Sequence, residues 1–209
     1  MSITTYDEVR AGVAGWLARD DLAGVVPDFI ALAEARINRL IRTRDMETRA
    51  TAAATAGNAY LALPESFGGV RYVKLTSTDP AAQLRFATPT QIDQMWAGSQ
   101  TGRPRVYAIV GDSFRLAPTP DAAYTVEIAY SRKVPALSAS NTTNWLLTAH
   151  PDLYLYGALV AAEGYLGNDA RLPAWKAQFD EALIELENQD AMDRWSGGPM
   201  AIRTDTGNP

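Results

Sequence analysis

The chain has 209 residues, of which 47% are hydrophobic and 21% charged, a composition sufficient for one or two compact domains with a substantial core. It contains no cysteine, which excludes disulfides and thiolate metal sites, and its formal net charge of −5 provides no overall positive field for nucleic acid. The opening MSITTYDEVR has no basic segment followed by an apolar run, so we expect synthesis and retention in a cytoplasm.

Two helices are predicted at the N-terminal end. Thr5 and Glu8 have the spacing of a capping box, and apolar residues then recur at helical spacing until the breaking region around Gly24. A second helix is predicted to start at Pro27. Its apolar stripe comprises Phe29, Ile30, Ala33, Ile37, Leu40 and Ile41.

Arginines are concentrated around the end of the second predicted helix, in RINRLIRTRDMETR. They are Arg36, Arg39, Arg42, Arg44 and Arg49. One interpretation is local, because arginines complement the negative end of a helix and pair with nearby carboxylates. A second is contact between subunits, since the planar guanidinium suits carboxylates across an interface. DNA phosphate binding is a third, weakened by the interspersed acids and the overall charge.

Between the N- and C-terminal helices the apolar period changes from about 3.6 residues to about 2, which indicates strands. Residues 124–131 alternate as a half-buried antiparallel strand does, and VYAIV-GD-SFRLAP predicts a hairpin turning at Gly111. AYLALP and VRYVKL are shorter candidate strands, and the Gly68 and Gly69 pair is interpreted as a turn between strands. Thr88 is expected to cap a small helix.

The stretch from Thr142 to Leu166 is the most apolar of the chain. Its apolar run from Leu153 is too short to cross a bilayer, which takes about 20 apolar residues, and it contains Glu163. A buried helix fits better, with Pro151 in the first turn and Gly167 as the stop. Its small residues Ala158, Ala161, Ala162 and Gly164 are expected to permit close helix packing.

A fourth long helix is predicted to follow and to end near Gly197 and Gly198. Its apolar stripe comprises Leu172, Trp175, Phe179, Leu183 and Leu186, and its other face carries Asp180, Glu181, Glu185 and Glu187. The segregated order of elements predicts an α+β fold. We expect a four-helix-type bundle from residues 1–49 and 136–195, a β-rich insertion over residues 50–135, and an extended C-terminal arm over residues 196–209.

No catalytic or cofactor site is predicted. His150 is the one histidine, it stands at a probable helix start, and no G-x-S-x-G elbow accompanies it, so a capping or packing role is expected. There is no H-x-x-x-H or EF-hand pattern for a metal and no glycine-rich loop for a nucleotide. The carboxylates of the fourth helix are interpreted as its solvated face.

Three segments together resemble the head-to-tail adaptor proteins of tailed bacteriophages. They are residues 6–49, residues 124–166 and the closing W-x-x-x-F helix. The most specific part is NWLL followed by HPDLYLYGAL, from Asn144 to Leu159, together with PDFI-x-L-A-E-x-R-I-N-R near the start. These motifs are structural and contain no catalytic signature.

The resemblance implies a non-enzymatic virion component without a cofactor, made in the host cytoplasm and placed at the head-tail junction. Such proteins form a homo-oligomeric ring of about twelve copies that docks on the portal protein, contacts tail or nozzle proteins and extends the DNA channel. Twelve copies would carry roughly −60 in formal charge, so the passing genome would slide without sequence-specific binding. No membrane is involved.

Within that resemblance, two candidate sites follow. The subunit interface is expected to bring Arg36, Arg39, Arg42 and Arg44 against Asp180, Glu181 and Glu185 of the next copy. The C-terminal arm is expected to dock on the portal through Met200, Ile202 and Arg203, the alternative being a frayed terminus.

Two other classes of function stay open. One is a small phage-encoded enzyme, a hydrolase that uses His150 and acidic residues in a cleft. The other is a monomeric cytoplasmic binding module with a peptide groove in the β-rich insertion.

Overall fold

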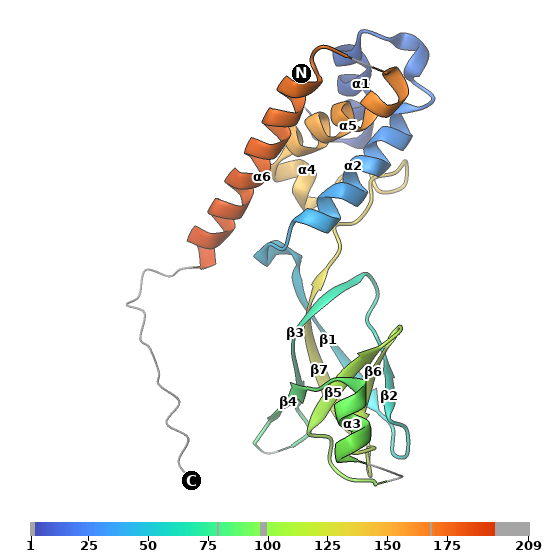
Figure 1. The fold of residues 1–209 in the computed structure, drawn as a ribbon, viewed down its shortest axis with the longest axis vertical. Helices are drawn as coiled ribbons and strands as arrows, with labels where there is room; N and C mark the ends of the chain where they lie inside the picture. The colour runs from blue at the N-terminus through green and yellow to red at the C-terminus, as the bar shows by residue number, and fades with distance from the viewer. Residues whose placement is uncertain (1–2, 79, 97–99, 168, 195–209) are drawn as a thin grey trace. The chain divides into compact units, whose positions relative to one another are not determined.

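The structure of the protein, a computed structural model, describes residues 3–78, 80–96, 100–167 and 169–194. The chain divides into two compact units (Figure 1). Met1–Arg44 and Pro135–Pro209 make up the first, which we call the helical unit, and Asp45–Val134 make up the second, the β unit.

The first two helices follow the sequence signals closely. Helix α1 (Tyr6–Leu17) starts with the predicted capping box, in which the Glu8 amide donates to Oγ1 of Thr5 at 3.3 Å and the Thr5 amide donates to Oε2 of Glu8 at 3.0 Å. A 3₁₀ turn, η1 (Asp20–Leu22), precedes helix α2 (Val26–Leu40). Pro27 stands in the first turn of α2, and its buried face includes Phe29, Ile30, Ala33 and Ile37. Both helices are confirmed, but Leu40 of the predicted stripe is 47% exposed.

The apolar stretch after residue 142 forms two helices. The short α4 (Trp145–Ala149) starts where the side chain of Asn144 accepts a hydrogen bond from the Leu147 amide, and α5 (Pro151–Leu166) begins at the proline. Gly167, with φ of 63°, ends α5 as predicted. Within the described residues no helix is both long enough and apolar enough to span a bilayer.

Helix α5 is the centre of the helical unit. It contacts α1, α2, α4 and α6 (Leu172–Arg194), and it is buried on several sides, including Leu153, Tyr154, Leu155, Gly157, Ala158, Leu159 and Ala162. A Cβ atom at Gly157 would lie 3.1 Å from Cβ of Ala33 and 3.1 Å from Cε2 of Phe179. The close packing of α2 and α6 on α5 therefore depends on Gly157, whereas the predicted Gly164 is exposed and has no neighbour within 4 Å.

Helix α6 buries Trp175, Phe179, Ala182 and Leu186. Three of these belong to the predicted stripe, while Leu172 and Leu183 are half-buried. The end predicted near Gly197 and Gly198 lies outside the described residues, as does the C-terminal arm.

Over its described residues the β unit contains seven strands and one short α-helix. They are β1 (Glu47–Ala54), β2 (Tyr60–Ala62), β3 (Phe67–Leu75), β4 (Ala82–Phe86), α3 (Pro89–Met95), β5 (Val106–Val110), β6 (Ser113–Ala117) and β7 (Tyr124–Arg132). A second 3₁₀ turn, η2 (Arg44–Met46), precedes β1. The strand order is β1-β7-β3-β4-β5-β6-β2, and all described pairings are antiparallel except β4 with β5. Because β1 and β2 are themselves in contact, the sheet is a nearly closed barrel.

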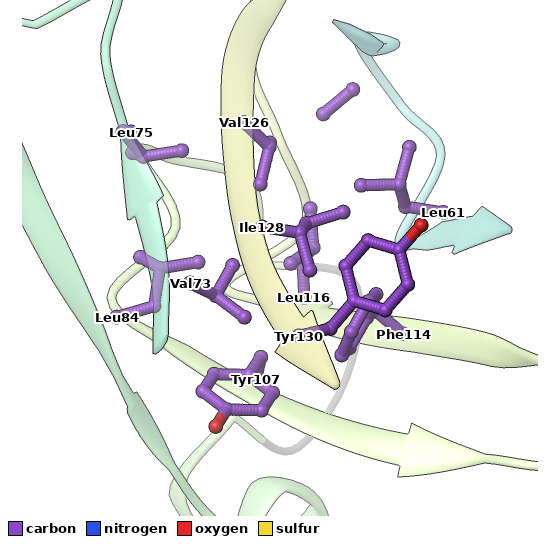
Figure 2. Packing of buried hydrophobic residues seen from close by; sticks show 11 residues of the cluster. Leu61, Val73, Leu75, Leu84, Tyr107, Phe114, Leu116, Val126, Ile128 and Tyr130 are labelled. Atoms are coloured by element: carbon purple, nitrogen blue, oxygen red, sulfur yellow. The ribbon is translucent and has the colours of Figure 1, made fainter. Parts of the chain in front are cut away.

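All seven strands contribute to one core. Figure 2 shows how its side chains converge from the strands. The ring centres of Tyr107 and Phe114 lie 5.7 Å apart. The buried residues of this cluster are Ala54, Leu61, Val73, Leu75, Leu84, Tyr107, Phe114, Leu116, Val126, Ile128 and Tyr130. The predicted hairpin is confirmed, since β5 and β6 pair across Gly111, whose φ is 59°.

The predicted fold class is wrong in its architecture. Among the described residues the helical unit has five α-helices, with α5 in contact with the other four, so it is not a four-helix bundle, and the strands form a nearly closed, barrel-like sheet. The reason for the first error is that α5 is apolar on nearly all sides, which marks a helix enclosed by others.

The interpretation of Gly68 and Gly69 as a turn is also wrong, because both lie inside β3. A Cβ at Gly68 would lie 2.9 Å from the carbonyl oxygen of Ser131 on β7. The glycine permits a close backbone approach between the two strands.

Candidate functional site

The arginines around the end of α2 have two different environments. Nη2 of Arg36 lies 3.8 Å from Oδ1 of Asp180, and its guanidinium carbon lies 4.7 Å from the centre of the Phe179 ring. Nη2 of Arg44 lies 3.3 Å from Oδ2 of Asp193, and the Arg44 amide donates to Oδ1 of Asp190 at 2.6 Å. These two arginines therefore contact α6 of the same chain.

The other arginines of the cluster are exposed. Arg42 donates from Nη1 to the carbonyls of Ile41 at 2.6 Å and Asn38 at 2.9 Å, which satisfies acceptors at the C-terminal end of α2. Arg39 is exposed in the last turn of α2. Arg49 belongs to β1 and hence to the β unit. Arg36, Arg42 and Arg44 therefore contact groups of their own chain, as the local interpretation of the arginine cluster expects. Arg39 is available for other contacts.

Helix α6 presents an acidic outer face. Glu181 and Glu185 are exposed, and Glu181 accepts a hydrogen bond from Nε2 of Gln178 at 3.3 Å. Between them in sequence, Ile184 is 59% exposed, an unusual position for a large apolar side chain on a charged face. The helix thus combines negative charge and apolar surface over one turn.

The outer face of helix α2 also combines an exposed aliphatic residue with a charged one, but here the charge is positive. Leu32 is 58% exposed, and Arg39 follows it seven positions later, which places the two side chains on the same side of the helix. One unit therefore carries an apolar and positive face on α2 and an apolar and negative face on α6. We call these the α2 stripe (Leu32, Arg39) and the α6 stripe (Glu181, Ile184, Glu185).

A buried polar network, which the sequence patterns do not predict, connects α2, α4 and α5. Glu34 is 8% exposed, and its Oε1 accepts hydrogen bonds from the Leu137 amide at 2.7 Å and from the Tyr154 hydroxyl at 3.4 Å. Nδ2 of Asn144 donates to Oη of Tyr154 at 2.7 Å and to the Pro135 carbonyl at 2.8 Å. The network fixes the segment before α4. A glutamate beside the apolar stripe of α2 was the signal available in the sequence.

Burial raises the pKa of the Glu34 carboxyl, and the hydrogen bonds from Leu137 and Tyr154 offset part of this rise. The protonated carboxyl therefore stabilises the fold below the ordinary value of 4.5, and this contribution is lost as pH rises through the higher folded-state pKa. We expect wild-type protein to lose more stability than Glu34→Gln between pH 4.5 and neutral pH, because glutamine keeps the acceptor without the charge. Urea unfolding of both proteins at both pH values measures this.

The control for this prediction is Glu185→Gln, the same substitution at an exposed position of α6, which should alter the stability difference between the two pH values less than Glu34→Gln does. Glu34→Ala should cost about 1–3 kcal/mol, because it leaves the buried Leu137 amide without its acceptor. If the free energy of unfolding of wild type and of Glu34→Gln changes in parallel with pH, the raised pKa of Glu34 does not contribute to the pH dependence of stability.

A second unpredicted contact fixes the connection between α5 and α6. Arg171 makes a bidentate contact with Asp169, its Nη1 donates to the carbonyl of Trp16 at 2.9 Å, and its guanidinium lies 4.7 Å from the Trp175 ring. The hydrogen bonds from the Arg171 side chain and amide hold the pKa of the Asp169 carboxyl at about 2. The contact links the start of α6 to the end of α1.

The candidate groups for catalysis are dispersed. His150 is half-buried at the junction of α4 and α5, and its side chain makes no capping hydrogen bond to α5, so of the two expected roles, capping and packing, the capping role is not seen. In the part of the chain that the structure describes, no three His, Asp or Glu side chains gather as a metal site would require. Met200, Ile202 and Arg203, the expected portal-docking residues, lie outside the described residues.

Comparison with known proteins adds the family. The family model described as "SU10 adaptor protein" matches residues 4–203, and the search of curated proteins gives no match. Proteins of this family are structural adaptors of the phage virion that associate with other head and tail proteins. Because the match covers both units, the chain belongs to the SU10 adaptor family of phage head-to-tail adaptor proteins.

Proposed function

We propose that this adaptor forms a ring of about twelve identical copies that docks on the portal protein, connects it to the tail and continues the DNA channel. The family supports the adaptor role in general. The observation that supports ring formation is the presence of two surfaces of opposite charge, the α2 stripe and the α6 stripe, on the same helical unit.

The α2 stripe and the α6 stripe differ in charge and share an exposed aliphatic residue, Leu32 on one and Ile184 on the other. A contact between two different surfaces of identical copies is heterologous, and it closes into a ring when the rotation between neighbours permits. In this arrangement Arg39 of one copy faces Glu181 and Glu185 of the next. Arg36 and Arg44, which contact α6 of their own chain, act by holding that helix in place.

The charge distribution supports a passage through which DNA slides. The helical unit contains sixteen Asp and Glu residues against ten Lys and Arg, while the β unit contains eight against nine. The helical unit is therefore the acidic part of the chain, and a ring of such units repels the phosphate backbone. No sequence-specific contact with the genome is required.

The C-terminal arm is proposed to dock on the portal, with Met200 and Ile202 as apolar anchors and Arg203 as a charged contact. Glycines and two prolines in SGGPMAIRTDTGNP disfavour a helix and suit a segment that orders on binding.

Electron microscopy of the protein purified with its cognate portal tests the proposal. We expect a ring seated on the portal, coaxial with its channel, and a variant truncated after Arg194 should fail to join the complex. A chain that stays monomeric and never associates with the portal would contradict the proposed function.

A further inference from the structure

A cleft of about 550 Å³ opens on the β unit beside β4. Its charged lining consists of Arg85, Arg103 and Arg105, and its apolar lining includes Met95, Trp96 and Pro104. Nothing in the proposed contacts between helical units uses this surface.

Residues of β4 and β5 line the cleft, and these two strands pair over a short length. Their parallel pairing comprises Arg85 with Val106 and Phe86 with Tyr107, and the Arg85 amide donates to the Arg105 carbonyl at 3.0 Å. Backbone groups alternate in direction along a strand, so the amide of Gln83 faces the same edge as that of Arg85. Beyond the short pairing, Ala82 and Gln83 of β4 line the cleft, on the side of the strand that an extended chain would approach.

The positive charge of the cleft is not neutralised by described neighbours. Elsewhere in the β unit, Arg71 pairs with Glu47 at 3.2 Å and Arg115 with Asp93 at 2.6 Å. Among the described residues none of the three cleft arginines forms such an ion pair, and Arg103 donates to the Thr78 hydroxyl at 3.4 Å. Three like charges around one hollow favour an anionic ligand.

The apolar lining distinguishes a protein ligand from duplex DNA. Met95 is 52% exposed and Trp96 is half-buried, so both offer contact area beside the arginines. Tryptophan, methionine and arginine are the residues enriched in protein interfaces, and the arginine fork suits carboxylates. Duplex phosphates lie on a convex polar surface that leaves such apolar groups without partners.

We propose that the cleft binds an extended acidic segment of a partner protein of the virion. Its carboxylates contact Arg85, Arg103 and Arg105, one apolar side chain packs on Met95 and Trp96, and its backbone lies along the edge of β4. The identity of the partner as a virion protein rests on the proposed function, whereas recognition of an acidic apolar segment rests on the cleft itself.

Fluorescence anisotropy with the full-length protein tests the proposal. The probe is a short labelled peptide of glutamates around a single phenylalanine, compared with the same peptide carrying glutamines. We expect the glutamate peptide to bind to the wild-type protein. The double substitution Arg103→Glu/Arg105→Glu should lower the affinity for this peptide by about tenfold or more. The matched control is Arg132→Glu/Lys133→Glu, which makes the same charge change at the exposed end of the β unit and should change affinity less than about twofold.

Equal binding of the glutamine peptide, or equal loss in both double variants, would overturn the proposal, as would no binding at all. Tighter binding of a duplex DNA oligonucleotide that is lost in the Arg103 and Arg105 variant would assign the cleft to nucleic acid instead. Circular dichroism checks that the variants fold. Because the assay uses the isolated chain, its failure is distinguishable from a failure to assemble on the portal, which is measured separately.

Discussion

Replacing Gly157 by leucine should destabilise the helical unit by about 3 kcal/mol or more, the largest effect of any single substitution proposed for this protein. A Cβ at this position already lies 3.1 Å from both Ala33 and Phe179, closer than the usual contact of about 3.5–4.0 Å between carbons. A leucine therefore has to push α2 and α6 away from α5. Denaturant unfolding followed by circular dichroism measures the loss.

The same helix provides a matched control for Gly157. Gly164 is also in α5, is exposed and has no neighbour within 4 Å, so Gly164→Leu should be neutral or stabilise by up to about 1 kcal/mol through helix propensity. The stability of Gly157→Ala should lie between the stabilities of the two leucine variants. Equal stability of the Gly157 and Gly164 leucine variants would show that the close packing is not a constraint.

Reversing the charge of the α2 stripe should abolish ring formation without unfolding the chain. Arg39→Glu places a carboxylate against Glu181 and Glu185 of the neighbouring copy, and like charges across an interface cost several kcal/mol. Because every interface of a closed ring is identical, the penalty is repeated at each of them. Light scattering of the protein mixed with its portal, together with imaging, measures assembly.

The complementary change provides the decisive control for the ring. Glu181→Arg/Glu185→Arg should also prevent assembly, and a triple variant that adds Arg39→Glu should restore it, because the attraction is re-formed with its signs exchanged. Arg132→Glu/Lys133→Glu, in the β unit, should assemble normally. If Arg39→Glu assembles as well as wild type, the α2 stripe is not a subunit contact.

Local signals in the sequence were sufficient for most individual elements. The capping boxes at Thr5 and Thr88, the proline at the start of α5 and the hairpin at Gly111 all act within a few residues. Each of these signals satisfies backbone hydrogen-bonding groups or a backbone conformation within a few residues, so the element can be predicted from the local sequence alone. The acidic face of α6 can be predicted for the same reason.

Elements whose environment is set by distant residues were missed or misassigned. Strand β1, with the sequence ETRATAAA, lacks the alternation of large apolar residues that marks a half-buried strand, and it is defined by its pairing with β7. The Gly68 and Gly69 pair predicts a turn because nothing near it in the sequence indicates the close approach of Ser131, which lies at the other end of the β unit's sequence. Strand pairing joins residues far apart in the chain, so neither feature leaves a local pattern.

The candidate site shows the same division. Composition identified a group of arginines and a group of carboxylates, but only the folded chain separates Arg36 and Arg44, which contact α6 of their own chain, from the exposed Arg39. The buried Glu34 and the cleft beside β4 were not anticipated at all. Burial and ion pairing depend on which elements meet.

The sequence by itself determined the starts of α1, α2 and α5, the β character of the middle of the chain and the resemblance to phage adaptors, because capping, periodicity and motif order are properties of neighbouring residues. The tertiary structure decided that α5 is enclosed by four other helices, that seven strands close on themselves and that an arginine cleft opens beside β4. These outcomes follow from long-range packing, in which each element is stabilised by partners that its own sequence does not specify.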